Sequence, residues 1–267
     1  ADLTSDATMM RAGANNSEIM YPQIEVGGLG DYDYNSGYTS AAVKLEWATA
    51  KFNYDRGAKI EVDVMDNEES RNIAFTRAGA ELQRTRVAPE ADAFTFATIC
   101  NFEGIAMEEE FFADAVEFLA ALIVAKNKMD EDEVPEEGRI LYATPTLMNG
   151  VMALDTTKSR EILNAFTVKK KVPQSRFYTA IDLLDGKSLG EEAGHYKKSD
   201  TAADINFMII HKPAIIKFDK HIAQDVIPAS LNANADGDIL KYRKYGLVDY
   251  YKNKERTHKM FAQIKKT

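Results

Sequence analysis

Early in the chain lies the segment Gly27-Gly28-Leu29-Gly30-Asp31-Tyr32-Asp33-Tyr34-Asn35-Ser36-Gly37-Tyr38. It is rich in glycine, aspartate and tyrosine, and it shows no continuous apolar face. Residues 19–26 before it form one extended stretch, in which Pro22 marks an edge strand. Residues 43–47 and 51–54 after it have the composition of strands. The segment is therefore predicted to be the tip of a long β-hairpin within residues 19–65.

The composition of this tip indicates contact with another subunit. Its four glycines make ordering costly, because glycine loses the most backbone freedom on folding. Large side chains at the tip are Leu29, Tyr32, Tyr34 and Tyr38, and tyrosine offers a large contact area at a small loss of rotamer freedom. Exposed aromatic residues with few charges among them are typical of interfaces. We expect these four residues to contact a neighbouring copy.

The segments on either side of the hairpin have simpler patterns. Residues 1–18 are polar, small and aperiodic, so they are expected to form an arm that contributes to assembly rather than to folding. Residues 55–57 are predicted to be a turn. Ile60, Val62 and Val64 alternate with acidic residues, which is the period of a half-buried strand.

Helices are expected next. Asp66 is predicted to cap a helix that runs to about residue 86, with Glu69 as its reciprocal capping partner. Pro89 should stop or kink this helix. Residues 90–99 are again helical in pattern, and a further helix is predicted over residues 108–128, where apolar residues recur at spacings of three and four.

The remainder, from residue 138 onward, mixes short elements of both kinds. Predicted strands cover residues 140–143, 205–211 and 214–218, with a strand pair over 239–251 and a short helix over 146–154. The predicted fold class is α+β.

Composition narrows the class of protein. The chain has 267 residues, 45% of them hydrophobic and 28% charged, as in a folded globular protein. Its longest apolar run is far shorter than the roughly 20 residues that span a bilayer, and no membrane association is expected. One cysteine, Cys100, cannot form an internal disulfide. A net charge of −9 argues against a sequence-specific DNA-binding protein. It is compatible with a protein that encloses DNA without binding it tightly.

Fragments of two binding motifs are incomplete. Gly186-Lys187-Ser188 matches the end of a phosphate-binding loop, but Ile181 occupies the position of its first glycine. Asn232 to Asp238 resembles the start of a calcium loop, but Arg243 occupies the position of the bidentate glutamate. No nucleotide or calcium site is expected.

Other reactive side chains favour ordinary roles. Asp63, Asp66, Glu68 and Glu69 surround a helix start, where carboxylates are favoured without any ligand. The four histidines lack the spacing of metal ligands. The sequence therefore predicts no enzyme, no catalytic residue, no metal and no cofactor.

Several collinear segments resemble the major capsid protein family of tailed bacteriophages, whose fold encapsulins share. The segments that carry this resemblance, from about residue 19 to 258, are residues 28–32, Trp47, 55–57, 62–69, 87–93, 135–145, 205–211 and 242–246.

The resemblance implies a Hong-Kong-ninety-seven-like phage capsid fold. It implies the following division: an N-terminal arm over 1–18; an extended-loop hairpin with peripheral-domain strands over 19–65; a spine helix in the peripheral domain over 66–104; an axial domain over 105–245; and a return to the peripheral domain over 246–267.

The resemblance also implies a function. The chain would assemble with itself, as hexamers and pentamers, into an icosahedral shell that encloses double-stranded DNA without sequence-specific binding. Portal and scaffold proteins would be further partners, and the shell would be assembled in the host cytoplasm to become the virion capsid. Two alternatives are an encapsulin-type cargo cage and a soluble α+β hydrolase or ligand-binding protein.

Overall fold

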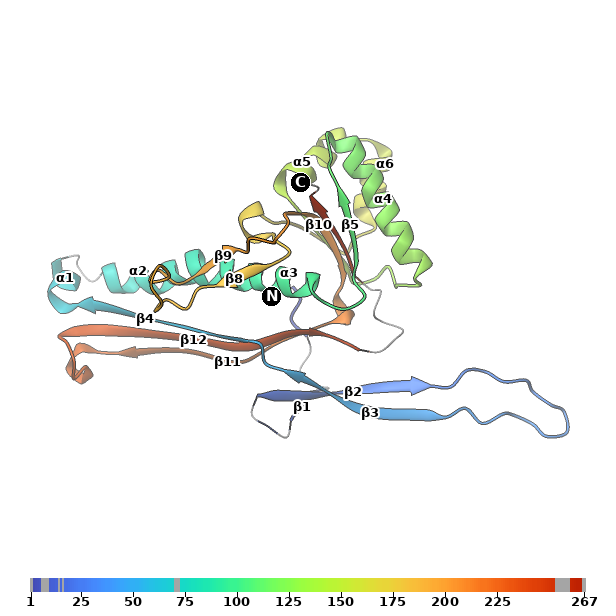
Figure 1. Ribbon diagram of the computed structural model, residues 1–267, viewed down its shortest axis with the longest axis horizontal. Helices are drawn as coiled ribbons and strands as arrows, with labels where there is room; N and C mark the ends of the chain where they lie inside the picture. The colour runs from blue at the N-terminus through green and yellow to red at the C-terminus, as the bar shows by residue number, and fades with distance from the viewer. Residues whose placement is uncertain are drawn as a thin grey trace.

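A computed structural model describes residues 2–5, 10–13, 15, 17–69, 73–252 and 260–265, with the backbone only at 68–69 and 73–76. Its elements form an elongated molecule with a long hairpin at one end, a long sheet at the other and a helix-covered sheet above them (Figure 1). This is a mixed α+β architecture, as predicted.

Four sheets organise the described chain. The hairpin sheet has the order β1 (Arg11–Ala12), β2 (Glu18–Val26), β3 (Val43–Lys51). The long sheet has the order β11 (Ile215–Ile227), β12 (Gly237–Tyr250), β4 (Tyr54–Asp63). The upper sheet has the order β5 (Ala106–Glu110), β13 (Met260–Lys265), β10 (Ile205–His211), β6 (Arg139–Ala143), β7 (Val168–Lys171). A small pair joins β8 (Ile181–Leu183) and β9 (Tyr196–Lys198).

The helices cover two of these sheets. Above the long sheet run α1 (Val64–Glu69), α2 (Ile73–Leu82), a π-helical turn over Gln83–Val87, and α3 (Ala88–Cys100). Against the upper sheet pack α4 (Ala115–Glu131), α5 (Pro145–Leu154) and α6 (Thr157–Asn164). Short 3-10 turns occupy Gln174–Arg176, Lys212–Ala214 and Ala229–Leu231.

Pro89, predicted to stop or kink the helix, does not end it. The π-helical turn lies directly before it, and the N–H of Ala88 donates to the carbonyl of Gln83. Proline lacks an N–H, and it is tolerated in the first turn of a helical register. Since Pro89 falls where the register changes and α3 begins, the helical path continues through it.

The first helix begins earlier than predicted. Its first residue is Val64, and the Asp63 carboxylate accepts a hydrogen bond from the N–H of Met65 at 2.9 Å. Asp63 is therefore the cap, and Asp66 lies inside the first turn, which corrects the prediction for Asp66. The side chain of Glu69, predicted as its partner, lies outside the described residues.

Two further segments differ from prediction because pairing between distant strands overrides local pattern. Residues 55–57 belong to β4 rather than to a turn, and Gly57 lets β4 approach β12, since a Cβ there would lie 2.9 Å from the carbonyl of Tyr242. Residues 108–110, predicted as the start of the helix over 108–128, belong instead to β5, which pairs in parallel with β13. The helix starts instead at Ala115, where Asp114 accepts bonds from the N–H groups of Val116 and Glu117.

Three hydrophobic clusters hold the described chain together. One lies between the upper sheet and α3, and a second between the upper sheet and α4 to α6. The third joins the base of the hairpin to the long sheet through Ile19, Tyr21, Ala50, Ile216 and Leu247.

Residues 2–5 pack against the folded body, whereas residues 1–18 were predicted to contribute to assembly rather than to folding. Leu3 is 4% exposed and belongs to the cluster between the upper sheet and α3. Ser5 donates its N–H to the carbonyl of Lys217 at 2.9 Å, and its hydroxyl donates to the carbonyl of Ile215. The expectation for residues 1–18 was wrong on this point, because one well-placed leucine buries itself without any periodic pattern around it.

The predicted domain boundary at residue 245 falls inside β12, so it does not coincide with the change from one sheet to another. Strands β11 and β12 lie in the long sheet with β4, whereas β13 lies in the upper sheet beside β5 and β10. The end of the described chain thus returns to the upper sheet. The assignment of these bodies as peripheral and axial domains of a shell remains a prediction.

Candidate assembly surface

The hairpin is regular along its strands. Strands β2 and β3 pair from Glu18 with Lys51 to Val26 with Val43, without a register shift. The connecting residues 27–42 extend the hairpin away from the rest of the molecule (Figure 1). Because the strands pair chiefly with each other, their two faces are covered only where the base meets the long sheet.

A small turn orders the tip locally. Gly37 donates its N–H to the carbonyl of Asp33 at 2.7 Å, and Asp33 Oδ1 accepts from the N–H of Asn35 at 2.6 Å. Gly37 has a φ of +79°, which favours glycine. The rings of Tyr32 and Tyr38 meet edge to face, with centroids 4.9 Å apart. The turn aligns these two rings on one part of the tip.

Exposure rises from base to tip. Tyr21 is fully buried, whereas Ile24, Val26, Val43 and Leu45 are more than half exposed. A run of apolar side chains on both strands therefore faces solvent in the single chain, which is costly at about 25 cal/mol for each Å² of apolar surface left in water. Contiguous exposed apolar surface of this kind marks interaction sites.

All four predicted contact residues lie on this exposed segment. The exposed fractions are 107% for Leu29, 61% for Tyr32, 93% for Tyr34 and 91% for Tyr38. The fold brings Tyr32 and Tyr38 together and leaves Leu29 and Tyr34 separate. Their contact with a neighbouring copy remains a prediction, since it lies between chains.

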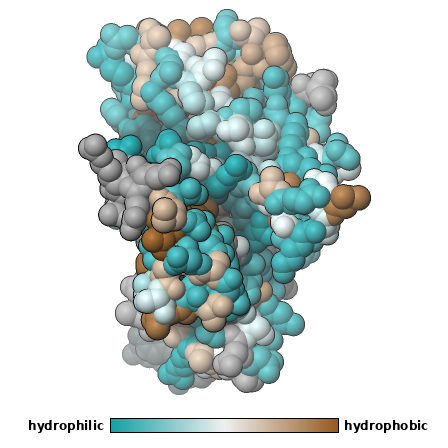
Figure 2. Space-filling view, turned by 90° about the vertical axis from the view of Figure 1, so that its left-hand side faces the viewer, coloured by the Kyte–Doolittle hydropathy of each residue, from teal (hydrophilic) through white to brown (hydrophobic). Residues whose placement is uncertain are grey.

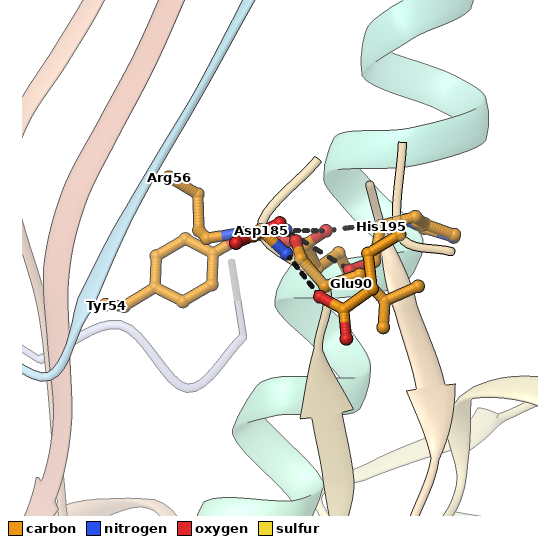
Figure 3. A network of polar contacts seen from close by, with 7 residues as sticks. Tyr54, Arg56, Glu90, Asp185 and His195 are labelled. Atoms are coloured by element: carbon orange, nitrogen blue, oxygen red, sulfur yellow. Dashed lines mark hydrogen bonds and ion pairs between the residues drawn. The ribbon is translucent and has the colours of Figure 1, made fainter. Parts of the chain in front are cut away.

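A buried polar network ties the long sheet to α3, and sequence reasoning missed it (Figure 3). Glu90 on α3, 6% exposed, accepts a bond from the Tyr54 hydroxyl at 3.1 Å and from Arg56 Nε at 2.7 Å. Arg56 Nη2 also donates to the carbonyl of Leu184 at 2.8 Å. Arg56 thus joins β4, α3 and the loop between β8 and β9.

His195 approaches Glu90 from the other side (Figure 3). Its Nδ1 lies 3.5 Å from Glu90 Oε2 and has no hydrogen-bond partner in the described structure. Burial lowers the pKa of His195; Glu90 opposes this shift, while Arg86 and Arg56 add to it. Burial, and then the Glu90 carboxylate, raise the pKa of Tyr54 well above its ordinary value. The network therefore favours a neutral imidazole beside the Glu90 side chain that bridges Tyr54 and Arg56.

No local signal in the sequence identifies this network, because its members come from distant positions. Glu90 follows Pro89 at a helix start, where an acid is expected for the helix dipole alone. A space of about 490 Å³ beside the network is lined by Arg56, Arg86, Glu90, Lys187 and His195 among others. Its cations and carboxylates are mixed, so it has no single charge preference.

The incomplete motifs have structural roles. Asp185 Oδ1 accepts the N–H groups of Lys187 and Ser188, both at 2.7 Å, so these amides already bind a carboxylate rather than a phosphate. Asn232 donates to the carbonyl of Gly237 within its turn, and Arg243 pairs with Asp55 at 2.7 Å. These two loops are closed by their own side chains.

The remaining reactive groups are dispersed. Cys100 is buried, and burial raises its pKa to about 12. His221 is exposed on β11, His211 is buried in β10, and His258 lies outside the described residues. Within the part of the chain that is described, histidine, cysteine and carboxylate side chains form no group of three suited to a metal ion.

Seen from the left-hand side of Figure 1, the surface is mainly hydrophilic, with hydrophobic residues in small separate groups (Figure 2). Among the described helices, none combines the length and the apolar composition needed to cross a membrane.

Solved structures with the same fold include phage capsids and a virus-like particle. The capsid of the cyanophage P-SCSP1u matches with a TM-score of 0.61 and 12% identity, over 96% of this chain and 86% of that chain. The mature capsid of bacteriophage PhiM1 matches with a TM-score of 0.59 and 14% identity, over 94% and 82%. A virus-like particle from Pyrococcus furiosus matches with a TM-score of 0.52 and 11% identity, over 91% and 84%.

No protein-family model matches the sequence, and no curated protein is similar to it. The structural matches nevertheless extend over more than nine tenths of this chain. The chain therefore has the Hong-Kong-ninety-seven-like fold of phage capsid subunits.

Proposed function

We propose that this chain is the major capsid protein of a tailed phage. Copies associate as hexamers and pentamers and build an icosahedral shell around double-stranded DNA. The protein acts as a structural subunit rather than as an enzyme. Its place is the virion, after assembly in the host cytoplasm with portal and scaffold proteins as partners.

The observation that carries the proposal is the exposed apolar hairpin on a capsid-type fold. Ile24, Val26, Val43 and Leu45 are more than half exposed on strands whose base is fixed to the long sheet. A rigid base with an apolar, projecting end is suited to reach over an adjacent subunit. Such a contact is heterologous, and heterologous contacts that close generate rings and shells.

The charge of the chain agrees with this role. A net charge of −9 disfavours binding of phosphate by the surface as a whole. A shell wall should enclose DNA without binding it tightly. Each phosphate that a basic side chain neutralises strengthens binding to DNA, so a wall with few such contacts is suitable. Enclosure without sequence-specific contact is thus the expected relation to the genome.

Electron microscopy of the purified chain tests the proposal. Closed shells, or capsomers of six and five subunits, are expected, and shells isolated from phage-producing cells should contain double-stranded DNA that is resistant to added nuclease. Shells filled with one enzyme would identify a cargo cage instead. Small discrete oligomers without shells would refute a capsid role and favour a soluble hydrolase or binding protein.

A further inference from the structure

The upper sheet has two open edges of opposite charge. Its order places β5 at one border and β7 at the other. Strand β5 is Ala106-Met107-Glu108-Glu109-Glu110, and β7 is Val168-Lys169-Lys170-Lys171. An edge strand is commonly protected by charge against unwanted pairing. Here one edge carries only acidic and the other only basic charges, so each edge repels itself and attracts the other.

The exposed charges are available to a second chain. Glu109 and Glu110 are exposed, and no hydrogen bond or ion pair of their carboxylates is found among the described residues. Lys169 Nζ donates to the carbonyl of Leu163, and Lys171 Nζ to the Asn149 side chain, both neutral acceptors. An ammonium has three donors, so these two lysines retain the capacity to bind a carboxylate.

Strand direction and facing are also compatible. Strand β5 runs parallel to β13 and β7 parallel to β6, while two antiparallel steps through β10 connect β13 to β6. Strands β5 and β7 therefore run in the same direction. A rotation about an axis roughly along the strands brings the β5 edge of one copy to the β7 edge of the next without reversing either.

The side chains match in this arrangement. Glu108 pairs with Lys128 of α4, and Lys169 bonds to α6, so both lie on the helix-covered side of the sheet. Because side chains alternate along a strand, Glu110 and Lys171 lie on that side too. Placing Met107 opposite Val168 then sets Glu110 opposite Lys171, with every pair on a common side.

We propose that the β5 edge of one copy docks against the β7 edge of the next, and that this contact orders the subunits head to tail around a capsomer. The occupant of each edge is a second copy of this chain. Like charges oppose a two-fold contact of β5 with β5, whereas opposite charges favour the ring. Surface ion pairs add little affinity but strongly select orientation. The inference rests on the proposed capsid function.

Two charge-reversed variants test the contact. E109K/E110K reverses two charges of the acidic edge, and K170E/K171E reverses the two lysines that face them in this register. Lys170 also pairs with Asp2 of its own chain at 3.3 Å, and the facing Glu108 and Lys169 are left unchanged in both variants. Each alone is expected to lower the fraction of subunits in capsomers at least about tenfold, because like charges then meet at every contact. The four-site variant, which exchanges these charges between the two edges, is expected to recover capsomers of both sizes.

Mixing the two variants gives a sharper outcome. Each chain then finds an oppositely charged edge only on the other variant, so rings must alternate between them. Alternation closes with six subunits but not with five. The mixture is therefore expected to form hexamers without pentamers, as counted by native mass spectrometry.

Matched controls are E137K and K158E, which change exposed charges away from both edges; both should assemble like the wild type. Circular dichroism and urea unfolding establish whether each variant is folded. If E109K/E110K does not fold, the near-isosteric variant E109Q/E110Q is used in its place. Wild-type chains that form no rings would refute the proposed function itself. Rings from the wild type together with normal rings from both charge-reversed variants would refute only the edge contact.

Discussion

Arg56 Nε lies 2.7 Å from Glu90 Oε1, and this ion pair joins the edge strand of the long sheet to the helix that crosses it. The side chains are 24% and 9% exposed, so the pair is largely withdrawn from water. Tyr54 and the carbonyl of Leu184 complete its hydrogen bonds. The pair therefore holds α3 against β4.

Arg56→Leu is expected to destabilise the subunit by about 3 kcal/mol, because it leaves the Glu90 carboxylate buried without its cation. The double variant R56L/E90L should lose less than Arg56→Leu alone, since no unpaired charge remains. Urea unfolding measures both. Arg84→Leu is the control, since Arg84 pairs with Glu81 and both side chains are more than half exposed, and its effect should stay within about 0.5 kcal/mol of zero. Equal losses for Arg56→Leu and Arg84→Leu would contradict the assigned role.

His195 should make subunit stability depend on pH. Burial lowers its pKa in the folded state relative to the unfolded chain. Below the unfolded pKa of about 6.5, the unfolded chain takes up a proton that the folded chain does not, so stability falls as pH falls toward the folded pKa. Thermal unfolding at pH 7.5 and pH 5 should show a smaller loss for His195→Gln than for the wild type. His221→Gln, which changes an exposed histidine, should retain the wild-type loss; an identical loss in all three chains would refute this role of His195.

Leu3→Ala is expected to destabilise the subunit by about 2 kcal/mol, because it opens a cavity in the cluster beneath the upper sheet. Leu29→Ala is the matched control, since Leu29 is fully exposed at the hairpin tip, and surface changes usually stay within about 0.5 kcal/mol. Denaturant midpoints compare the two. If Leu3→Ala unfolds like the wild type, residues 2–5 do not belong to the folded core.

Asp63→Ala should lower the free energy of unfolding by about 1 kcal/mol, as expected for loss of a helix cap. Asp66→Ala should have the smaller effect, because a carboxylate inside the first turn acts only through the helix dipole. Thermal midpoints measured side by side decide between them. A larger loss for Asp66→Ala would restore Asp66 as the cap.

Local signals in the sequence predicted much of the fold. The two strands on either side of the hairpin tip, the buried run at 205–211 and the short helix near 146–154 all formed close to their predicted positions. The helix cap is Asp63 rather than Asp66. Both residues are aspartates close to the helix start, and aspartate is favoured as a cap at either position. Errors of this kind are confined to the ends of elements.

Features that depend on distant pairing could not be predicted. Glu108 to Glu110 form a strand because residues 263–265 lie beside them. The Glu90 network gathers residues from β4, α3 and the loop before β9, none of which carries a motif. Leu3 is a single apolar residue in a polar stretch, and only the folded cluster shows where it packs.

The hairpin tip should be ordered mainly by neighbouring subunits. Residues 27–38 contain one small turn at Asp33 to Gly37, while Leu29, Tyr34 and Tyr38 are almost fully exposed, so little local burial offsets the entropy of ordering, roughly 1–2 kcal/mol per residue. Residues 60–62 pair with the central strand of the long sheet and should be ordered in every state. Amide hydrogen exchange tests both regions: the tip should exchange fast in free subunits and slowly in shells, with residues 60–62 protected in both. Equal protection of the tip before and after assembly would mean that the hairpin orders itself, and the contacts assigned to Leu29, Tyr32, Tyr34 and Tyr38 would then be wrong.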